Sequence, residues 1–172
     1  RFDRLRFDDS RGRNANLLED AFKFAKMGGT IDLTCGESES KFHSVADAVK
    51  KAKKEGVPME KVTMSSDGQG SWSNYDAEGK LVEIGVSDVD TIYRQIVYMV
   101  KEENMDLEEL LALGTKNPAM ALELYPKKGA VKEESDADIL IMNEDLSLDT
   151  VIAMGVPMMR DGKILKKGTY EK

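Results

Sequence analysis

The sequence has 172 residues, of which 41% are hydrophobic and 33% are charged, a composition typical of a globular chain with one sizeable core. The net charge of -7 and the scattered basic residues argue against a nucleic-acid-binding protein. No apolar run of about 18 residues predicts a membrane span, and the single cysteine, Cys35, excludes an internal disulfide. We therefore expect a cytoplasmic protein with neither a nucleic-acid nor a membrane partner.

Predicted helices and buried strands alternate in the first part of the chain. Residues 1–13 have no clear period and are interpreted as a loop or tail. The next helix can be capped by Asn14 or Asn16 and can end with Gly28 in the left-handed conformation. In order, the predicted elements are a helix to about 27, a strand over 30–35, a helix from Ser44 to about 56, a strand over 62–66, a hairpin over 74–85, a helix over 88–102 and helical pieces over 107–113 and 118–124. This alternation predicts a parallel α/β architecture over residues 1–125.

The pattern changes to all-β after Tyr125-Pro126. Short strands are predicted over 138–142, 150–153, 156–160 and 163–166. Asp161-Gly162 between the last two is a hairpin signal. We expect residues 126–172 to form a second, smaller β module.

The most informative candidate site follows the second predicted strand. Ligands bind at the carboxyl ends of parallel strands, where loops converge. There the sequence reads Ser65-Ser66-Asp67-Gly68-Gln69-Gly70-Ser71. Asp67 can ligate a cation or act as a general base on a metal-bound water. An Asp-Gly pair after a strand is more often only a turn, and both readings stay open on this motif alone.

Other candidate residues favour structural roles. His43 is the only histidine and is expected just before the cap of a lysine-rich helix, so a surface or capping role is favoured over metal binding. Cys35 ends a predicted buried strand, where a small apolar residue is common. Arg13 can bind a carboxylate in a bidentate manner, although exposed arginines are frequent. Trp72 and Tyr75 fit either a pocket mouth or the packing of their own hairpin.

Several motifs together resemble one enzyme family. Gly28-Gly29-Thr30-Ile31-Asp32, followed by the Ser65–Ser71 motif at its spacing, resembles the isoaspartyl dipeptidases, also called β-aspartyl peptidases. Asn117-Pro118-Ala119, Asp136-Ala137-Asp138 and the closing Arg160-Asp161-Gly162-Lys163 resemble the C-terminal signature of amidohydrolases in general. The resemblance extends from about Arg13 to the end of the chain.

The resemblance implies a fold and a chemistry. The family has a (β/α)8 barrel with a two-zinc site, plus a β-sandwich built from both ends of the chain, and it cleaves β-aspartyl dipeptides. The strands at 30–34 and 62–66 match the seventh and eighth barrel strands. Asp67 matches the aspartate that ligates zinc and shuttles the proton, and Ser71 and Arg13 match positions that contact the substrate. The expected fold is therefore a partial (β/α)8 barrel, holding its last two strands and their helices, followed by part of the β-sandwich.

The sequence also departs from the family. Ser10 stands where the family has a metal-ligand histidine, three residues before Arg13, and Glu133-Glu134-Ser135 stands where a Pro-Gly turn is usual. A complete barrel takes about 250 residues. We therefore expect a truncated portion that is inactive alone, and an open half barrel that self-associates or forms homo-oligomers because its strand edges are uncovered.

Two alternatives remain open at this stage. One is a different amidase of the same superfamily, such as a D-aminoacylase or a cyclic-amide hydrolase, against which Arg13 and Ser71 argue. The other is a non-catalytic binding or assembly module that keeps part of the fold.

Overall fold

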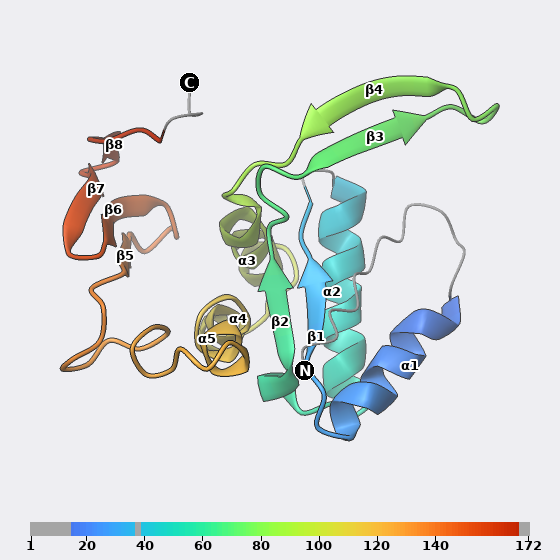
Figure 1. The fold of residues 1–172 in the computed structure, drawn as a ribbon, viewed down its shortest axis with the longest axis horizontal. Coiled ribbons are helices and arrows are strands. Elements are labelled where there is room, and N and C mark those ends of the chain that lie inside the picture. Colours follow the sequence, from blue (N-terminus) through green and yellow to red (C-terminus); the bar gives the residue numbers. More distant parts are fainter. Residues whose placement is uncertain (1–14, 37–38, 169–172) are drawn as a thin grey trace.

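The computed structural model describes residues 15–36 and 39–168, which form a mixed α/β fold (Figure 1). A parallel pair of strands and its helices come first, a hairpin projects from them, and an antiparallel sheet ends the chain. The elements are α1 (Ala15–Lys26), β1 (Ile31–Thr34), α2 (Glu39–Lys54), a short 3-10 helix (Met59–Lys61), β2 (Val62–Ser65), β3 (Ser71–Tyr75), β4 (Leu81–Val86), α3 (Thr91–Lys101), α4 (Leu107–Gly114), α5 (Lys116–Ala121), β5 (Ile139–Met142), β6 (Leu148–Ala153), β7 (Val156–Arg160) and β8 (Lys163–Ile164).

The parallel pair β1–β2 is the centre of the first part of the chain. Ile31 pairs with Val62, and the register runs to Thr34 opposite Ser65. Both strands are rich in β-branched residues, which suits a pleated, largely buried surface. Apolar side chains of β1, β2 and all four long helices around them form one core. Its buried members are Ala21, Phe22, Ala25, Ile31, Leu33, Cys35, Val45, Ala46, Ala48, Val49, Ala52, Val57, Val62, Met64, Ile96, Met99, Leu110 and Leu113.

The end of α1 follows the sequence prediction, whereas the predicted start of α2 is wrong. Gly28 has φ 97°, the left-handed conformation expected after a helix. Asn16 lies inside α1 rather than at its cap, and residues 1–14, including Asn14, lie outside the described residues. Helix α2 begins at Glu39 and not at Ser44. Serine is tolerated inside a helix at a small cost, so a possible cap residue does not fix where a helix begins.

The hairpin β3–β4 projects beyond the carboxyl ends of β1 and β2 (Figure 1). It begins at Ser71, three residues before the predicted start, and Trp72 pairs with Gly85 across it. A Cβ on Gly85 would lie 2.0 Å from the Trp72 ring, so the indole covers the glycine backbone. Packing within the hairpin therefore accounts for Trp72. Tyr75 is half exposed on the same hairpin.

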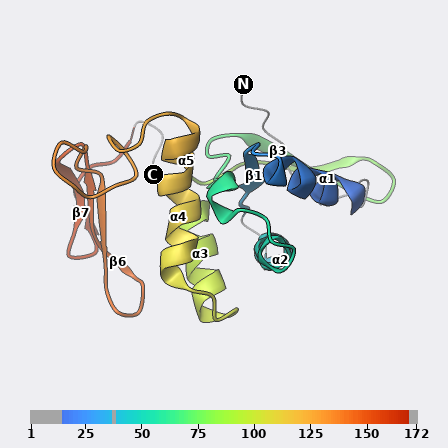
Figure 2. The ribbon, with the colours of Figure 1, turned by 90° about the horizontal axis from the view of Figure 1, so that it is seen from below.

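The four-stranded antiparallel sheet has the order β5-β6-β7-β8. Figures 1 and 2 both show α3, α4 and α5 between this sheet and the parallel pair. The turn between β7 and β8 has positive φ at both Asp161 and Gly162, as the sequence signal for a tight hairpin predicts. Among the described helices, none has the length and apolar character needed to cross a membrane.

Candidate active site

The chain turns sharply directly after β2, and this turn carries Asp67. Asp67 has φ 51° and Gln69 has φ 63°, in the left-handed region that residues with a side chain rarely adopt. Each such conformation costs about 1 kcal/mol and persists only where the surrounding structure enforces it. Two of them within three residues mark a turn whose shape is held from outside.

Hydrogen bonds to the end of the hairpin hold the second half of the turn. The Gly70 N–H donates to the Asp67 carbonyl at 2.8 Å and closes the turn. The Gln69 N–H donates to the Ser87 carbonyl at 2.8 Å, and the Ser87 N–H donates to the Gly70 carbonyl at 2.9 Å. The hairpin thus fixes the backbone directly after Asp67.

The start of α3 holds the first half of the turn. The Ser66 hydroxyl accepts from the Gly68 N–H at 3.0 Å, and the Ser66 carbonyl accepts from the Thr91 hydroxyl at 3.3 Å. A Cβ on Gly68 would lie 2.8 Å from Cγ1 of Val89, so this position has no room for a side chain. The backbone is therefore held by hydrogen bonds on both sides of Asp67, at Ser66–Gly68 and at Gln69–Gly70.

A polar network that the sequence analysis missed lies beneath the turn. Asp32 of β1 accepts a hydrogen bond at Oδ1 from the Thr63 hydroxyl at 2.7 Å, and at Oδ2 from the Ser65 hydroxyl. The available signal was the alternation of polar residues along both strands, with Asp32 and Thr34 facing the same side as Thr63 and Ser65. This side of the parallel pair is therefore polar as far as Ser65, two residues before Asp67.

The predicted site residues have different positions in the structure. Asp67 lies at the carboxyl end of β2, half-buried, and Ser71 is the exposed first residue of β3 at the other end of the turn. The turn therefore brings Asp67 and Ser71 to the same end of the parallel pair. Arg13 lies outside the described residues.

Cys35 is buried in the core at the end of β1, and its N–H donates to the Ser65 carbonyl at 2.8 Å. This bond extends the β1–β2 pairing by one residue beyond the strands. The buried position agrees with the expectation that Cys35 serves as a small apolar residue at the end of a strand.

The sequence analysis placed His43 just before the start of its helix, but in the structure it lies inside α2. Its ring meets the ring of Tyr98 edge to face, with the centroids 5.4 Å apart, and its Nδ1 is 2.6 Å from the Tyr98 hydroxyl. The same hydroxyl donates to Glu103 at 3.2 Å. A hydrogen bond from Lys50 holds the pKa of Glu103 below its usual range. This partly buried cluster joins α2 to the C-terminal end of α3 and takes no part in the Asp67 turn.

The described residues do not fit a complete zinc site. Zinc takes about four ligands, usually from histidine, cysteine and carboxylate side chains. Among the side chains of residues 17–36 and 43–168, no three of these types come together in a way that could hold a metal ion. Asp67 is therefore one possible ligand at this end of the sheet, and the described part of the chain does not complete its coordination.

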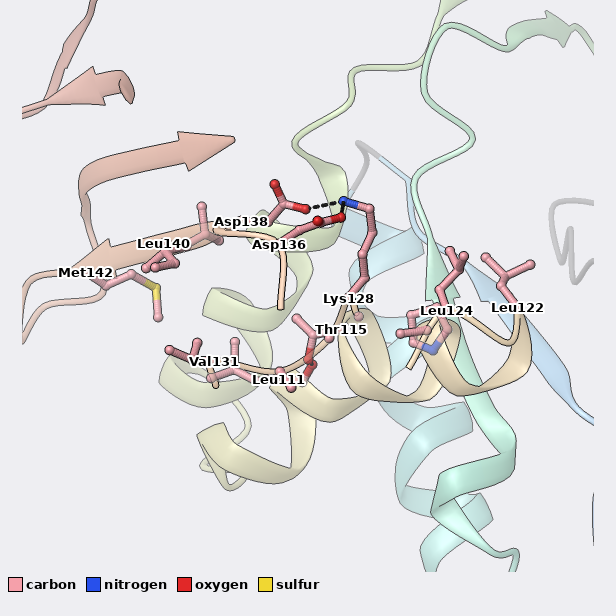
Figure 3. Close-up of a pocket in the computed structure, with 16 residues that line it drawn as sticks. Leu111, Thr115, Leu122, Leu124, Lys128, Val131, Asp136, Asp138, Leu140 and Met142 are labelled. Atoms are coloured by element: carbon pink, nitrogen blue, oxygen red, sulfur yellow. Dashed lines mark hydrogen bonds and ion pairs between the residues drawn. The ribbon is translucent and has the colours of Figure 1, made fainter. Parts of the chain in front are cut away.

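A cavity of about 520 Å³ lies between α4, α5 and β5 (Figure 3). Its lining is mostly apolar and does not include Asp67 or Ser71. The Lys128 amine points at two carboxylates, 3.0 Å from Asp136 and 2.5 Å from Asp138 (Figure 3). Lys128 brings one positive charge to two carboxylates, so one negative charge stays in excess at this end of the cavity, and the rest of its lining is mostly apolar. The turn at Asp67 is the better candidate active site.

Comparison with known proteins agrees with the resemblance seen in the sequence. A β-aspartyl dipeptidase from Fervidobacterium islandicum AW-1, solved in complex with β-Asp-Leu, is 35% identical, with a TM-score of 0.77 over 92% of this chain and 41% of that chain. A second structure of β-aspartyl dipeptidase from that organism is 32% identical, with a TM-score of 0.68 over 92% and 38% of the two chains. The chain thus spans about two fifths of the length of these enzymes.

A more distant similarity concerns the fold alone. The N-acetylglucosamine-6-phosphate deacetylase from Thermotoga maritima is 14% identical, with a TM-score of 0.59 over 91% of this chain and 47% of that chain. The model of the amidohydrolase family matches residues 10–165. Because this match takes in most of the sequence, the chain belongs to the amidohydrolase family.

Proposed function

We propose that this chain supplies the Asp67 part of an active site that hydrolyses β-aspartyl dipeptides. The observation that carries the proposal is the anchored turn after β2, which holds a carboxylate at the carboxyl end of a parallel strand. The 35% identity to a β-aspartyl dipeptidase that was solved with β-Asp-Leu supports this substrate class.

Asp67 is the proposed catalytic residue. Hydrolysis of an amide needs a group that takes a proton from the attacking water and returns it to the leaving amine, and a carboxylate can do both. We also assign Asp67 as a zinc ligand, with the remaining ligands supplied from outside the described residues. Ser71 and Arg13 are the proposed substrate-binding residues, with Arg13 pairing with the α-carboxylate of the dipeptide.

The proposal includes an arrangement for the rest of the fold. We place β1 and β2 as the seventh and eighth strands of a (β/α)8 barrel within residues 1–125, and residues 126–172 in a β-sandwich. A barrel closes only when each edge strand has a neighbour. Self-association of this chain, as a homo-oligomer, is the proposed way to cover the outer edges of the β1–β2 pair.

A segment exchange tests the function. The matching segment of the Fervidobacterium β-aspartyl dipeptidase is replaced by residues 15–168 of this chain, and hydrolysis of β-Asp-Leu is measured with α-Asp-Leu as the control substrate. We expect hydrolysis of the β-linked dipeptide alone, and its loss with Asp67→Asn.

Asp161→Asn is the matched control, because Asp161 also has positive φ but sits in the turn between β7 and β8. This variant should keep full activity. A folded, zinc-loaded exchange protein whose activity is unchanged by Asp67→Asn would contradict the proposed role of Asp67.

A further inference from the structure

The polar side of the β1–β2 pair has a single acidic residue, Asp32. Strand residues alternate between the two sides of a sheet, so Ile31 and Leu33 face the core while Asp32 faces the other side with Thr63. Aspartate is unfavourable in strands because its carboxylate competes with backbone pairing. Its presence in the middle of a four-residue strand therefore calls for a specific interaction.

Both carboxylate oxygens of Asp32 are engaged by the neighbouring strand. Oδ1 accepts from the Thr63 hydroxyl at 2.7 Å, and Oδ2 accepts from the Ser65 hydroxyl. Thr63 is almost fully buried, and its hydroxyl is also 3.2 Å from the Ile31 carbonyl. Hydrogen bonds to a charged acceptor are stronger than those between neutral groups. Asp32 therefore holds β2 at Thr63 and Ser65, the two residues of that strand that face the polar side.

The second of these positions is the last strand residue before the turn. Ser65 precedes Asp67 by two residues, a distance of about 7 Å in extended chain. The Cys35 N–H donates to the Ser65 carbonyl, so the same residue is held through both its backbone and its side chain. Beyond Ser65 the chain enters the left-handed conformation of Asp67.

We propose that Asp32 is a positioning residue for Asp67. A strained turn keeps its shape only if both of its ends are fixed. Ser87 fixes the far end through two backbone hydrogen bonds, and Asp32 fixes the near end through Ser65. The link to catalysis rests on the proposed function, whereas the link between Asp32 and the shape of the turn does not.

Amide hydrogen exchange on the whole chain tests the inference without any assay of activity. The reporters are the N–H groups of Cys35, bonded to Ser65, and of Gly70, bonded to Asp67. We expect Asp32→Asn to speed exchange at both by about tenfold or more, because asparagine leaves one hydroxyl facing an amide group instead of a carboxylate oxygen. Exchange in the middle of α2, at Val49, should change much less.

Three further variants sharpen the test. Ser65→Ala and Thr63→Val each remove one hydroxyl and serve if Asp32→Asn fails to fold. Ser65→Ala should accelerate exchange at Gly70 more than Thr63→Val, because Ser65 adjoins the turn. Asp149→Asn is the matched control, since Asp149 is a strand aspartate that accepts from a threonine hydroxyl, Thr150, at 2.8 Å in the other sheet.

The outcomes separate this inference from the proposed function. Unchanged exchange at Gly70 in Asp32→Asn and Ser65→Ala, or an equal acceleration at Gly70 and Val49, would overturn the positioning role. Accelerated exchange confined to the turn supports that role even if the segment-exchange protein fails to hydrolyse β-Asp-Leu. In an active exchange protein, Asp32→Asn should lower kcat about tenfold or more with little change in KM, because small misplacements of a catalytic group cost rate rather than binding.

Discussion

Gly70 leaves space that the backbone and side chain of Asp67 fill. A Cβ at position 70 would lie 2.8 Å from Asp67 Oδ1 and 2.8 Å from the Asp67 carbonyl oxygen. Gly70 itself does not have positive φ, so its role is to provide room and not backbone freedom. The glycine and the aspartate of this motif are thus coupled by direct contact.

Gly70→Ala should therefore displace the Asp67 carboxylate. We expect a loss of about 1–3 kcal/mol in the free energy of unfolding, as for other overpacked sites. We also expect shifted backbone resonances at Gly68 and Ser71. Gly79→Ala is the control, because a Cβ there meets open space at a hairpin turn with φ 83°. It should lower stability by about 1–2 kcal/mol, because alanine is strained at positive φ, and leave the resonances around Asp67 unchanged. Unshifted resonances in Gly70→Ala would argue against the tight contact.

Asn117 ties the Asn-Pro-Ala motif to the start of β2. Its side-chain N–H group donates to the carbonyls of Met59 at 2.7 Å and Val62 at 2.9 Å, and the residue is buried. Asn117→Ala leaves two carbonyls without these donors, so we expect a loss of about 2–3 kcal/mol in the free energy of unfolding. Urea unfolding followed by circular dichroism measures it. Thr115→Ala, at an exposed position of the same segment, should cost less, and equal losses would contradict this account.

Asp138 makes stability depend on acid pH. A hydrogen bond from Lys128, and a second from the Met154 N–H at 2.7 Å, hold the pKa of Asp138 below its usual range. A carboxyl whose pKa is lower in the folded state adds stability above its unfolded pKa of about 4, and this stability is lost as the pH falls through the folded pKa. The free energy of unfolding should therefore decrease as the pH drops below about 4.

Asp138→Asn should flatten this part of the stability profile and lower stability at neutral pH. Urea unfolding at a series of pH values between about 2 and 7 tests both effects. A profile for Asp138→Asn that is parallel to that of the unmodified chain would exclude the contribution of this ion pair.

Local patterns in the sequence were sufficient for most of the elements. The β-branched runs predicted β1 and β2, Gly28 ended α1, and Asp161-Gly162 made the tight turn, because each depends on residues close together in the chain. The predicted start of α2 was wrong because a serine is only a possible cap, and the surrounding packing decides where the helix begins. The same error misplaced His43 relative to the helix.

The contacts that shape the candidate site were beyond the reach of sequence patterns. The motif identified Asp67 and its neighbouring glycines. It gave no sign that Asp32 bonds to Thr63 and Ser65, which lie more than thirty residues away. Such partners depend on the register of a parallel pair, and local sequence patterns do not predict that register. The cavity beside Lys128 was missed for the same reason, since its walls come from segments that meet only in the fold.

The assignment of Asp67 as a zinc ligand is tested most directly by equilibrium dialysis of the purified chain against zinc, followed by elemental analysis and an assay with β-Asp-Leu. We predict weak binding of clearly less than about one zinc ion per chain, no turnover, and loss of the bound zinc in Asp67→Asn but not in Asp161→Asn, because one carboxylate supplies only one of about four ligands. Equal zinc binding by the unmodified chain and Asp67→Asn would contradict the assignment. Stoichiometric zinc with turnover would contradict the view that this chain alone holds an incomplete site.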